Sequence, residues 1–329
     1  MLLPISYTGI SEHTRMLNDN VRTCSFIQGI QEVVKPGDVV VDIGTGTGIL
    51  AIAAAKAGAK KVYAIEASSM GKIAHAHFEA NGLAHKISLI PGWSQNITLP
   101  EKADVMISET IGHDPLSENI LEITTHASEQ LLKPNAILIP SKMRIFGLPL
   151  TIPSEILQAN TPTIENLRNW AESYNVDFTI FGISASQTPH HFRINPSMAR
   201  EWQPISEPVL IMELSFGAGG VASSSSHEGD DLDAIAPRKE QNNTTVDIAQ
   251  KGIANISGII NGILVFFELE VSPSQMITTH PNNAESGCSW KSPVWTLPET
   301  FELEEGEPYQ IRYSRGPNHS EIRFARGAI

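Results

Sequence analysis

The stretch VVVDIGTGTGILAIAAAKAG, from Val39 to Gly58, decides the fold of this chain. It opens on a run of β-branched residues, which is typical of a buried strand. A turn with alternating glycines follows, and then an apolar run at helical spacing that ends at Gly58, a residue suited to the left-handed end of a helix. Strand, glycine-rich turn and helix in this order form the usual cradle for a nucleotide-like ligand.

The residues around this stretch alternate in the same way up to about Pro140. The short apolar runs predict strands over Val39–Ile43, Lys61–Ile65, Ile87–Ile90, Asp104–Ser108 and Ala136–Ile139. The spacing of apolar residues predicts helices over Ile49–Ala57, Ser69–Asn81 and Ser117–Leu132. We therefore expect residues 1–140 to form a Rossmann-like α/β domain with a parallel sheet.

The pattern changes after Pro140. Runs such as PVLIMELSF and GIINGILVFFELEV predict antiparallel strands, so we expect a second, mostly antiparallel domain over residues 141–329. Helical spacing over Ser154–Tyr174 interrupts this domain as an inserted arm. The polar segment Ser223–Asn243 contains few large apolar residues and predicts a mobile surface loop.

Charge and cysteine content exclude several classes of protein. The chain has 329 residues and a formal net charge of −13 at pH 7. A general nucleic-acid-binding protein needs a basic face, so this charge argues against that class. It suits attraction of a cationic substrate, and equally an acidic surface that only maintains solubility. Cys24 and Cys288 form no CxxC spacing, so we expect neither a disulfide framework nor a thiolate metal site.

No run of the sequence approaches the length needed to span a bilayer. The opening residues, MLLPISYTGISEH, lack the basic segment and the long apolar run of a signal peptide. We therefore expect a cytoplasmic protein with no membrane partner.

The turn after the first strand indicates which cofactor it holds. Its glycines are Gly44, Gly46 and Gly48. A pyrophosphate-binding GxGxxG motif would place its third glycine where Ile49 stands. Asp42 would repel a diphosphate but suits a cofactor that carries a sulfonium and an ammonium group. Glu66 ends the next strand, where its carboxylate can accept hydrogen bonds from both ribose hydroxyls. These residues favour S-adenosylmethionine over NAD.

An acidic loop, SETIGHDPLSE (residues 108–118), follows the fourth predicted strand. Glu109 stands at the carboxyl end of that strand, and Glu118 follows nine positions later. Two carboxylates on one loop can clamp a planar guanidinium through paired hydrogen bonds. By spacing alone, two glutamates on a polar loop are more often solvent-exposed or capping residues, and Glu118 fits the first turn of the next helix.

These residues, in this order, resemble the protein arginine methyltransferases over most of the chain. HTRMLNDNVRT (residues 13–23) looks like the family's helix over the cofactor, and residues 108–118 have the length and ends of its double-glutamate loop. NWAESYNVDFT (169–179) resembles the start of its dimerisation arm, and CSWKSPVW (288–295) aligns with its tryptophan-containing loop. The resemblance implies a class I methyltransferase domain, a β-barrel domain with an arm at about 154–205, and a homodimer.

The resemblance also implies roles for residues around the cofactor. Arg22, supported by Asp19 and Asp42, would pair with the cofactor carboxylate. Glu66 would bind the ribose, and Gly44 and its neighbours would pack against the methionine part. The remaining positions that it assigns to the cofactor are His13, Met16, Ser94 and Gln95.

On the substrate side, the resemblance implies that Glu109 and Glu118 bind and polarise a guanidinium. Thr110 and Ile111 depart from the bulky residues that often follow the first glutamate of the family. Ser289 stands where a histidine is expected, and His113 is a candidate substitute. The substrate pocket expected from these positions consists of Thr110, Ile111, His113, Ser289 and Trp290.

The sequence therefore predicts an S-adenosylmethionine-dependent N-methyltransferase without a metal. Its acceptor would be a guanidino nitrogen of arginine, in a peptide or protein, in free arginine or in another small guanidine. Two other functions remain compatible with these residues. One is a small-molecule methyltransferase that acts on an amine or hydroxyl, and the other is a catalytically silent scaffold.

Overall fold

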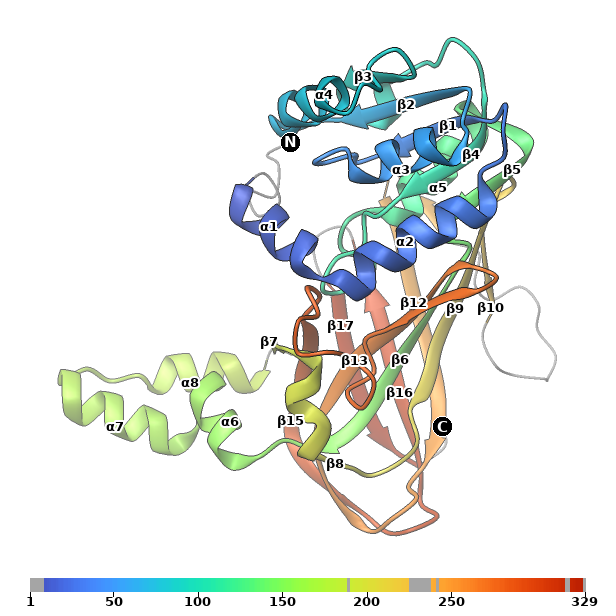
Figure 1. The fold of residues 1–329 in the computed structure, drawn as a ribbon. Coiled ribbons are helices and arrows are strands. Elements are labelled where there is room, and N and C mark those ends of the chain that lie inside the picture. The colour runs from blue at the N-terminus through green and yellow to red at the C-terminus, as the bar shows by residue number, and fades with distance from the viewer. Residues whose placement is uncertain (1–8, 188–189, 225–237, 241–242, 317–319, 328–329) are drawn as a thin grey trace.

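The computed structural model describes residues 9–187, 190–224, 238–240, 243–316 and 320–327. An α/β part lies above an antiparallel part, and a helical arm projects from the latter (Figure 1). The fold confirms the predicted class, a Rossmann-like domain followed by mostly antiparallel sheets.

A parallel sheet forms the centre of the α/β part, in the order β3-β2-β1-β4-β5. Its strands are β1 (Val39–Ile43), β2 (Lys61–Glu66), β3 (Ile87–Pro91), β4 (Ala103–Ser108) and β5 (Leu132–Ile139). Every residue of β1 is buried, as expected for a central strand that is covered on both faces. The strand order reverses between β1 and β4, so their carboxyl ends open the crevice in which such sheets bind ligands.

Helices surround this sheet. They are α1 (Ile10–Asn18), α2 (Asn20–Val33), α3 (Ile49–Ala57), α4 (Met70–Ala80) and α5 (Ile120–Gln130), with the short 3₁₀ helix η2 (Ser94–Asn96). Helix α3 has the predicted bounds and ends at Gly58, which has a φ of 116°. Helix α5 begins later than predicted because Asn119 adopts a left-handed φ of 63°. Before it, the Ser117 amide donates to the Asp114 carbonyl at 2.9 Å, so Glu118 stays in the loop.

Two antiparallel sheets form the second part of the described chain. The larger contains β6 (Lys142–Thr151), β7 (His190–Ile194), β8 (Gln203–Pro204), β9 (Val209–Gly217), β10 (Gly220–Ser224), β13 (Gly258–Ser272), β14 (Gln275–Thr278) and β15 (Ser292–Leu303). The smaller contains β11 (Arg238–Glu240), β12 (Asn243–Ile253), β16 (Pro308–Arg315) and β17 (Ser320–Arg326). Strand β9 lies beside β12, and β15 lies beside β17, so the sheets enclose a common core that includes the buried Tyr309 and Tyr313.

The projecting arm consists of α6 (Ser154–Asn160), α7 (Ile164–Tyr174) and α8 (Thr179–Gln187) (Figure 1). The Thr163 side chain caps α7 by accepting from the Asn166 amide. The arm ends earlier than the expected position near 205. Strand β7 pairs with β15, and β8, after the 3₁₀ helix η3 (Pro196–Glu201), pairs with β6, so residues 190–204 return to the larger sheet.

The segment expected to be a mobile loop, residues 223–243, is partly strand. Strand β10 runs to Ser224, and β11 pairs with β12, which begins at Asn243. The rest of that segment lies outside the described residues.

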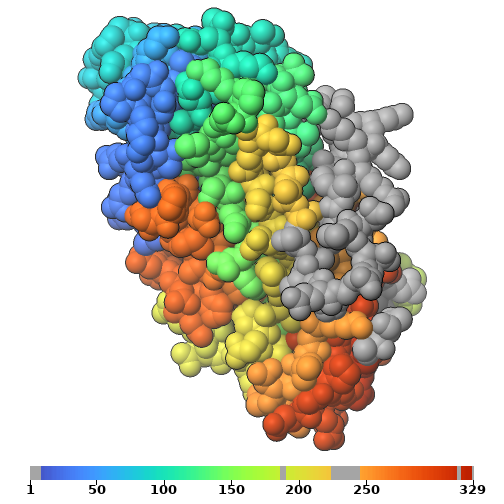
Figure 2. Space-filling view, turned by 90° about the vertical axis from the view of Figure 1, so that its right-hand side faces the viewer, coloured from blue at the N-terminus to red at the C-terminus, as the bar shows by residue number. Residues whose placement is uncertain are grey.

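The two parts of the chain pack directly on each other. Helix α2 lies against β13 and β14, and a Cβ on Gly29 would come within 2.8 Å of Val271 Cγ1. Glu32 of α2 accepts hydrogen bonds of 2.6 Å from the hydroxyls of Ser272 and Ser274. In Figure 2 the blue N-terminal helices lie against the orange segment that follows β13. Among the described residues, no helix is long and apolar enough to cross a membrane.

Candidate active site

A cavity of about 280 Å³ opens at the carboxyl ends of β1 and β4, between the α/β part, helices α1 and α2, and the loop before β15. It contains almost all of the site residues expected from the sequence. The expected residues that line it are His13, Met16, Arg22, Gly44, Gly46, Glu66, Ser94, Gln95, Glu109, Thr110, Ile111, His113, Glu118, Ser289 and Trp290. Asp42 and Gly48 are the two expected site residues that do not line it.

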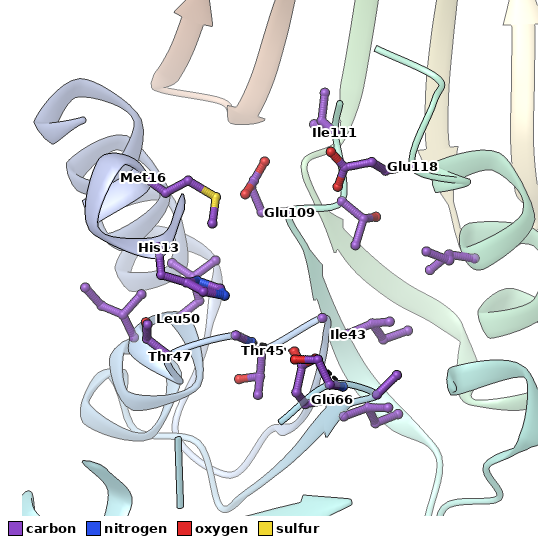
Figure 3. A pocket seen from close by; sticks show the side chains of 18 of the residues that line it. His13, Met16, Ile43, Thr45, Thr47, Leu50, Glu66, Glu109, Ile111 and Glu118 are labelled. Carbon is purple, nitrogen blue, oxygen red and sulfur yellow. Dashed lines mark hydrogen bonds between the residues drawn. The ribbon is translucent and has the colours of Figure 1, made fainter. Parts of the chain in front are cut away.

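The glycine turn forms one wall. Gly44, Gly46 and Gly48 have φ values of 77°, 54° and 84°, a left-handed region that other residues rarely adopt. A Cβ on Gly46 would lie 2.8 Å from His13 Cε1, so the missing side chain makes room for the His13 ring of α1. Figure 3 shows His13 and Met16 on this helix, facing the cavity. Helix α1 therefore covers the turn.

Gly48 has a packing role instead of a place in the cavity wall. A Cβ at this position would lie 2.5 Å from Phe78 Cε1 of α4. The turn therefore needs a glycine here so that α4 can pack against it. Gly48 was expected to contact the cofactor, but it does not line the cavity.

Asp42 is buried beneath the turn. Its Oδ2 accepts a 2.5 Å hydrogen bond from the Thr45 hydroxyl. Burial is the largest cause that raises its pKa, to about 7, and the nearby Glu66 carboxylate raises it further. Asp42 thus shapes the turn from below. Of the two carboxylates expected to support Arg22, Asp19 is the one whose charge raises the pKa of Arg22.

Glu66 joins the end of β2 to the glycine turn. Its Oε2 accepts from the Gly46 amide and its Oε1 from the Ser68 amide, both at 2.8 Å. These backbone amides hold the carboxylate at the cavity wall. Each carboxylate oxygen has a second lone-pair direction, so Glu66 can also accept from a ligand hydroxyl.

Helix η2 brings Ser94 and Gln95 to the same wall, where the resemblance places adenine contacts. Ser94 is buried, and its neighbour Trp93 is 46% exposed although it also lines the cavity.

The acidic loop forms the opposite wall. Glu109 follows β4 directly, and Glu118 returns to the cavity from the far end of the loop. Figure 3 shows the two carboxylates facing the same space. Because Asn119 delays the start of α5, Glu118 does not act as a residue of the first helical turn.

Arg22 reaches this wall from α2. Its guanidinium forms an ion pair with Glu109 and lies 5.4 Å from the ring centroid of Trp290. Burial lowers the pKa of Arg22 to about 10, while the negative charges of Asp19 and Glu118 raise it. Arg22 therefore keeps its charge at neutral pH, and Glu109 pairs with the guanidinium of this chain's own Arg22.

Hydrogen bonds from its backbone and from Trp290 fasten the loop before β15 to the site. Trp290 Nε1 donates to the Ile111 carbonyl at 2.9 Å, and the Lys291 amide donates to His113 Nδ1 at 3.0 Å. The Ser289 amide donates to Asp19 Oδ2 at 2.7 Å. Asp19 also caps α2 by accepting from the Arg22 amide at 3.0 Å. The loop thus fixes both α2 and the acidic loop.

Thr110 and His113 complete the acidic wall. The Thr110 hydroxyl lies 3.0 Å from the Ser108 hydroxyl, and its methyl group lies over Gly44. Burial is the main cause that lowers the pKa of His113, to about 4, and the charges of Arg193, Arg15 and Lys291 lower it further. His113 is therefore neutral at pH 7 and serves as an acceptor.

Several lining residues were not expected from the sequence. They include Arg15, Thr45, Thr47, Leu50 and Trp93. The two threonines alternate with the glycines of the turn, so the glycine motif could have predicted that they line the cavity. Arg15 lies on α1 between His13 and Met16, and its Nη1 donates to the distant Ser289 carbonyl at 2.7 Å.

Comparison with known proteins gives matches over the same regions. Residues 21–143 match the family model of the ribosomal protein L11 methyltransferase (PrmA). The chain is 27% identical to protein arginine N-methyltransferase PRMT10 of Arabidopsis thaliana, over 92% of this chain and 79% of that protein. It is 33% identical to the histone-arginine methyltransferase CARMER of Drosophila persimilis over 92% of this chain, which spans about half (53%) of that relative.

Solved structures show the same fold. The structure of the Trypanosoma brucei PRMT1 enzyme-prozyme heterotetrameric complex with AdoHcy matches with a TM-score of 0.73 at 22% identity, covering 98% of this chain and 100% of that one. Arabidopsis thaliana protein arginine methyltransferase 10 matches with a TM-score of 0.67 at 23% identity, covering 98% of both chains. The chain is therefore similar in sequence, over 92% of its length, and in fold to protein arginine N-methyltransferases, and its glycine turn and double-glutamate loop lie in one cavity.

Proposed function

We propose that this chain is an S-adenosylmethionine-dependent N-methyltransferase that acts on a guanidino nitrogen of arginine. The observation that carries the proposal is the single cavity that contains both the glycine turn and the two loop carboxylates, Glu109 and Glu118. The two relatives named above, PRMT10 and CARMER, are arginine methyltransferases by name and support the proposal.

The residues present fit the cofactor. Gly44 and Gly46 leave the space that a Cβ would fill beside Thr110 and His13. Arg22 offers a cation for the cofactor carboxylate, and Glu66 offers acceptors for the ribose. The adenine would lie against Ser94 and Gln95. S-adenosylmethionine bound in this cradle supplies an electrophilic methyl group.

The chain's own contribution is to hold and orient the acceptor. Glu109 and Glu118 bind the guanidinium from two sides and localise its charge, which leaves the reacting nitrogen more nucleophilic. Positioning of that nitrogen is the main catalytic effect, because transfer requires a close and collinear approach. A free guanidinium does not lose its proton at pH 7, so the proton leaves the nitrogen during or after transfer.

The exposed arm supports assembly with a second copy. Its helices α7 and α8 carry exposed apolar side chains, including Ile164 at 79% and Ile180 at 75% exposure. Helix α1 also exposes Ile10, at 72%. We infer a homodimer in which the arm of one copy packs on the α/β part of the other. Light scattering should show a dimer, and Ile180→Glu should give a monomer.

Mass spectrometry of the reaction products tests the proposed activity. We expect methylation of a guanidino nitrogen when the chain is incubated with S-adenosylmethionine and either an arginine-containing peptide or free arginine. Glu109→Gln should lower this methylation about a hundredfold or more, because one of the two orienting charges is lost. Glu101→Gln, at an exposed position paired with Lys60, is the matched control and should leave it unchanged.

The other outcomes separate the competing functions. Cofactor binding without methylation of any guanidine would favour a scaffold. Methylation of an amine or a hydroxyl alone would identify a different small-molecule methyltransferase. Unchanged turnover in Glu109→Gln would contradict the role of the glutamate clamp.

A further inference from the structure

Three cations meet at the edge of the acidic wall, around His113. They are Arg15 of α1, Arg193 of β7 and Lys291 of the loop before β15, and we call them the basic rim. The positive charge of each of them lowers the pKa of His113. His113 in turn lines the cavity that contains Glu109 and Glu118.

The contacts place the basic rim on one side of the cavity. Arg15 lines the cavity, and its Nη1 donates to the Ser289 carbonyl at 2.7 Å. The Lys291 amide donates to His113 Nδ1 at 3.0 Å. Arg193 lies opposite Pro293 in the pairing of β7 with β15, two residues beyond Lys291. Three distant segments therefore place Arg15, Arg193 and Lys291 beside the same edge; Arg15 lines the cavity, and Arg193 and Lys291 stand next to its wall.

These charges are only partly balanced by acidic residues. Arg15 pairs with Glu12 at 2.5 Å. The carboxylate of Asp114, the other acidic group near this edge, is buried and accepts from the Tyr313 hydroxyl at 3.1 Å. Within the described part of the chain, neither Arg193 nor Lys291 forms an ion pair with a carboxylate.

We propose that the basic rim binds a carboxylate of the substrate while Glu109 and Glu118 bind its guanidinium. The preferred acceptor is then a guanidino compound that carries a carboxylate beside the methylated group. The carboxylate belongs to the α-carbon of free arginine or to an acidic residue next to arginine in a peptide. This inference rests on the proposed function and names the substrate class of the same site.

Opposite charges at the two ends of the acceptor also fix its direction. A carboxylate is repelled by the two loop glutamates, and a guanidinium is repelled by the basic rim. Only one orientation therefore satisfies both ends, and this orientation places the guanidino group at the clamp. Recognition of this kind contributes more to specificity and capture than to the chemical step.

A pair of matched substrates tests the proposal. Arginine and agmatine differ by the carboxylate alone, and so do two peptides in which Asp or Asn stands next to the arginine in an otherwise neutral sequence. We expect a higher kcat/KM for the carboxylate-bearing member of at least one pair. An exposed ion pair contributes about two- to fivefold for each cation, so the ratio should be about tenfold for the complete rim. It should fall as salt is added.

Variants of the basic rim identify the cations responsible. Arg193→Gln and Lys291→Gln should each lower the arginine-to-agmatine or Asp-to-Asn ratio by about two- to fivefold, and the double variant should leave only the about two- to fivefold contribution of Arg15. Lys251→Gln, at an exposed position of β12, is the matched control and should leave the ratio unchanged. A circular dichroism melt of each variant separates an effect on folding from an effect on recognition.

The outcomes distinguish the two sources of the carboxylate. They also separate failure of the basic-rim proposal from failure of the proposed function. A preference confined to arginine over agmatine identifies the α-carboxylate, and a preference confined to the peptides identifies a neighbouring acidic residue; both support the basic rim. Equal kcat/KM within both pairs would overturn it while leaving methyl transfer intact. Absence of methylation on all four substrates, with the cofactor bound, would overturn the proposed function instead.

Discussion

The two walls of the cavity are built in different ways. The turn wall, made of residues 44–48 with Glu66, is held by contacts between residues that are close in the chain, such as the bond from Gly46 to Glu66 across 20 positions. The acidic wall, made of residues 109–118, is held by the loop before β15, through bonds that span 178 positions to His113 and 179 to Ile111. The turn wall therefore depends on the α/β part alone, whereas the acidic wall depends on the packing of both parts.

This difference predicts that substitutions can damage one wall and leave the other in place. The turn wall should respond to changes in backbone freedom and in buried charge. The acidic wall should respond to changes in the hydrogen bonds that fasten it to the loop before β15.

The largest effect is expected from Gly48→Ala. The new Cβ would overlap the Phe78 ring and would force a side chain onto a φ of 84°. The left-handed backbone strain, about 1–2 kcal/mol, and the overpacking, about 1–3 kcal/mol, should together lower the free energy of unfolding. Cofactor binding should weaken as well, because the turn forms part of the cavity wall. Gly82→Ala is the control, because its φ is also positive, at 68°, but a Cβ there meets nothing within 4 Å. Chemical denaturation that gave equal losses for the two variants would contradict the packing role of Gly48.

Asp42→Asn tests the buried charge beneath the turn wall. The pKa of Asp42 is about 7 in the folded chain, against an ordinary value of 3.8 in the unfolded chain. Between about pH 4 and pH 7 the unfolded chain loses this proton first, so the stability that Asp42 contributes falls as pH rises, by up to about 4 kcal/mol. Asparagine can still accept from Thr45 and does not titrate. The free energy of unfolding of the parent minus that of the variant should therefore fall across this range; a difference independent of pH would contradict the raised pKa.

Trp290→Phe tests the fastening of the acidic wall. It removes the bond from Nε1 to the Ile111 carbonyl and leaves that acceptor without its donor, at a cost of about 1–3 kcal/mol. We expect turnover to fall more than cofactor affinity, because the turn wall does not contact this bond. Calorimetry of cofactor binding beside steady-state kinetics makes the comparison, and an equal loss of both would show that the walls are not independent.

The smallest effect is expected from His113→Asn, which keeps an acceptor for the Lys291 amide. The pKa of His113 is lowered to about 4, from an ordinary value of 6.5. Between these values the unfolded chain gains a proton before the folded chain does, so the contribution of His113 to stability is lost as pH falls from about 6.5 to about 4. The direction is opposite to that of Asp42. Denaturation of parent and variant at pH 5 and pH 7 should show it, and a larger difference at pH 5 would contradict it.

The turn wall was also the part that the sequence predicted best. Strand β1 and helix α3 have the predicted bounds, since a buried run, a glycine turn and a C-terminal glycine are local signals. The positions of Asp42 and Gly48 were less predictable. Sequence order places them beside the turn, but the face of the turn that they occupy depends on how Thr45 and Phe78 pack around them.

The acidic wall could be predicted only as a pair of glutamates at a known spacing. The start of α5 at Ile120, the contact of Arg22 with Glu109 and the basic rim all depend on tertiary packing. Arg193 and Lys291 lie far from the acidic loop in the chain, and no local pattern marks them as its neighbours. The end of the arm at Gln187 was missed for the same reason, because strand pairing, rather than a local signal, returns residues 190–204 to the sheet.

The most direct test of the central claim is Glu118→Gln, measured for both cofactor binding and methyl transfer in one preparation. Arg22 forms an ion pair with Glu109, and this substitution keeps both partners of that pair. We predict that the affinity for S-adenosylhomocysteine, measured by calorimetry, stays within about twofold of the parent, while single-turnover methylation of arginine falls about a hundredfold or more. Methylation at the parental rate, or a loss of cofactor binding that matches the loss of methylation, would contradict a cavity with separate walls for cofactor and guanidinium.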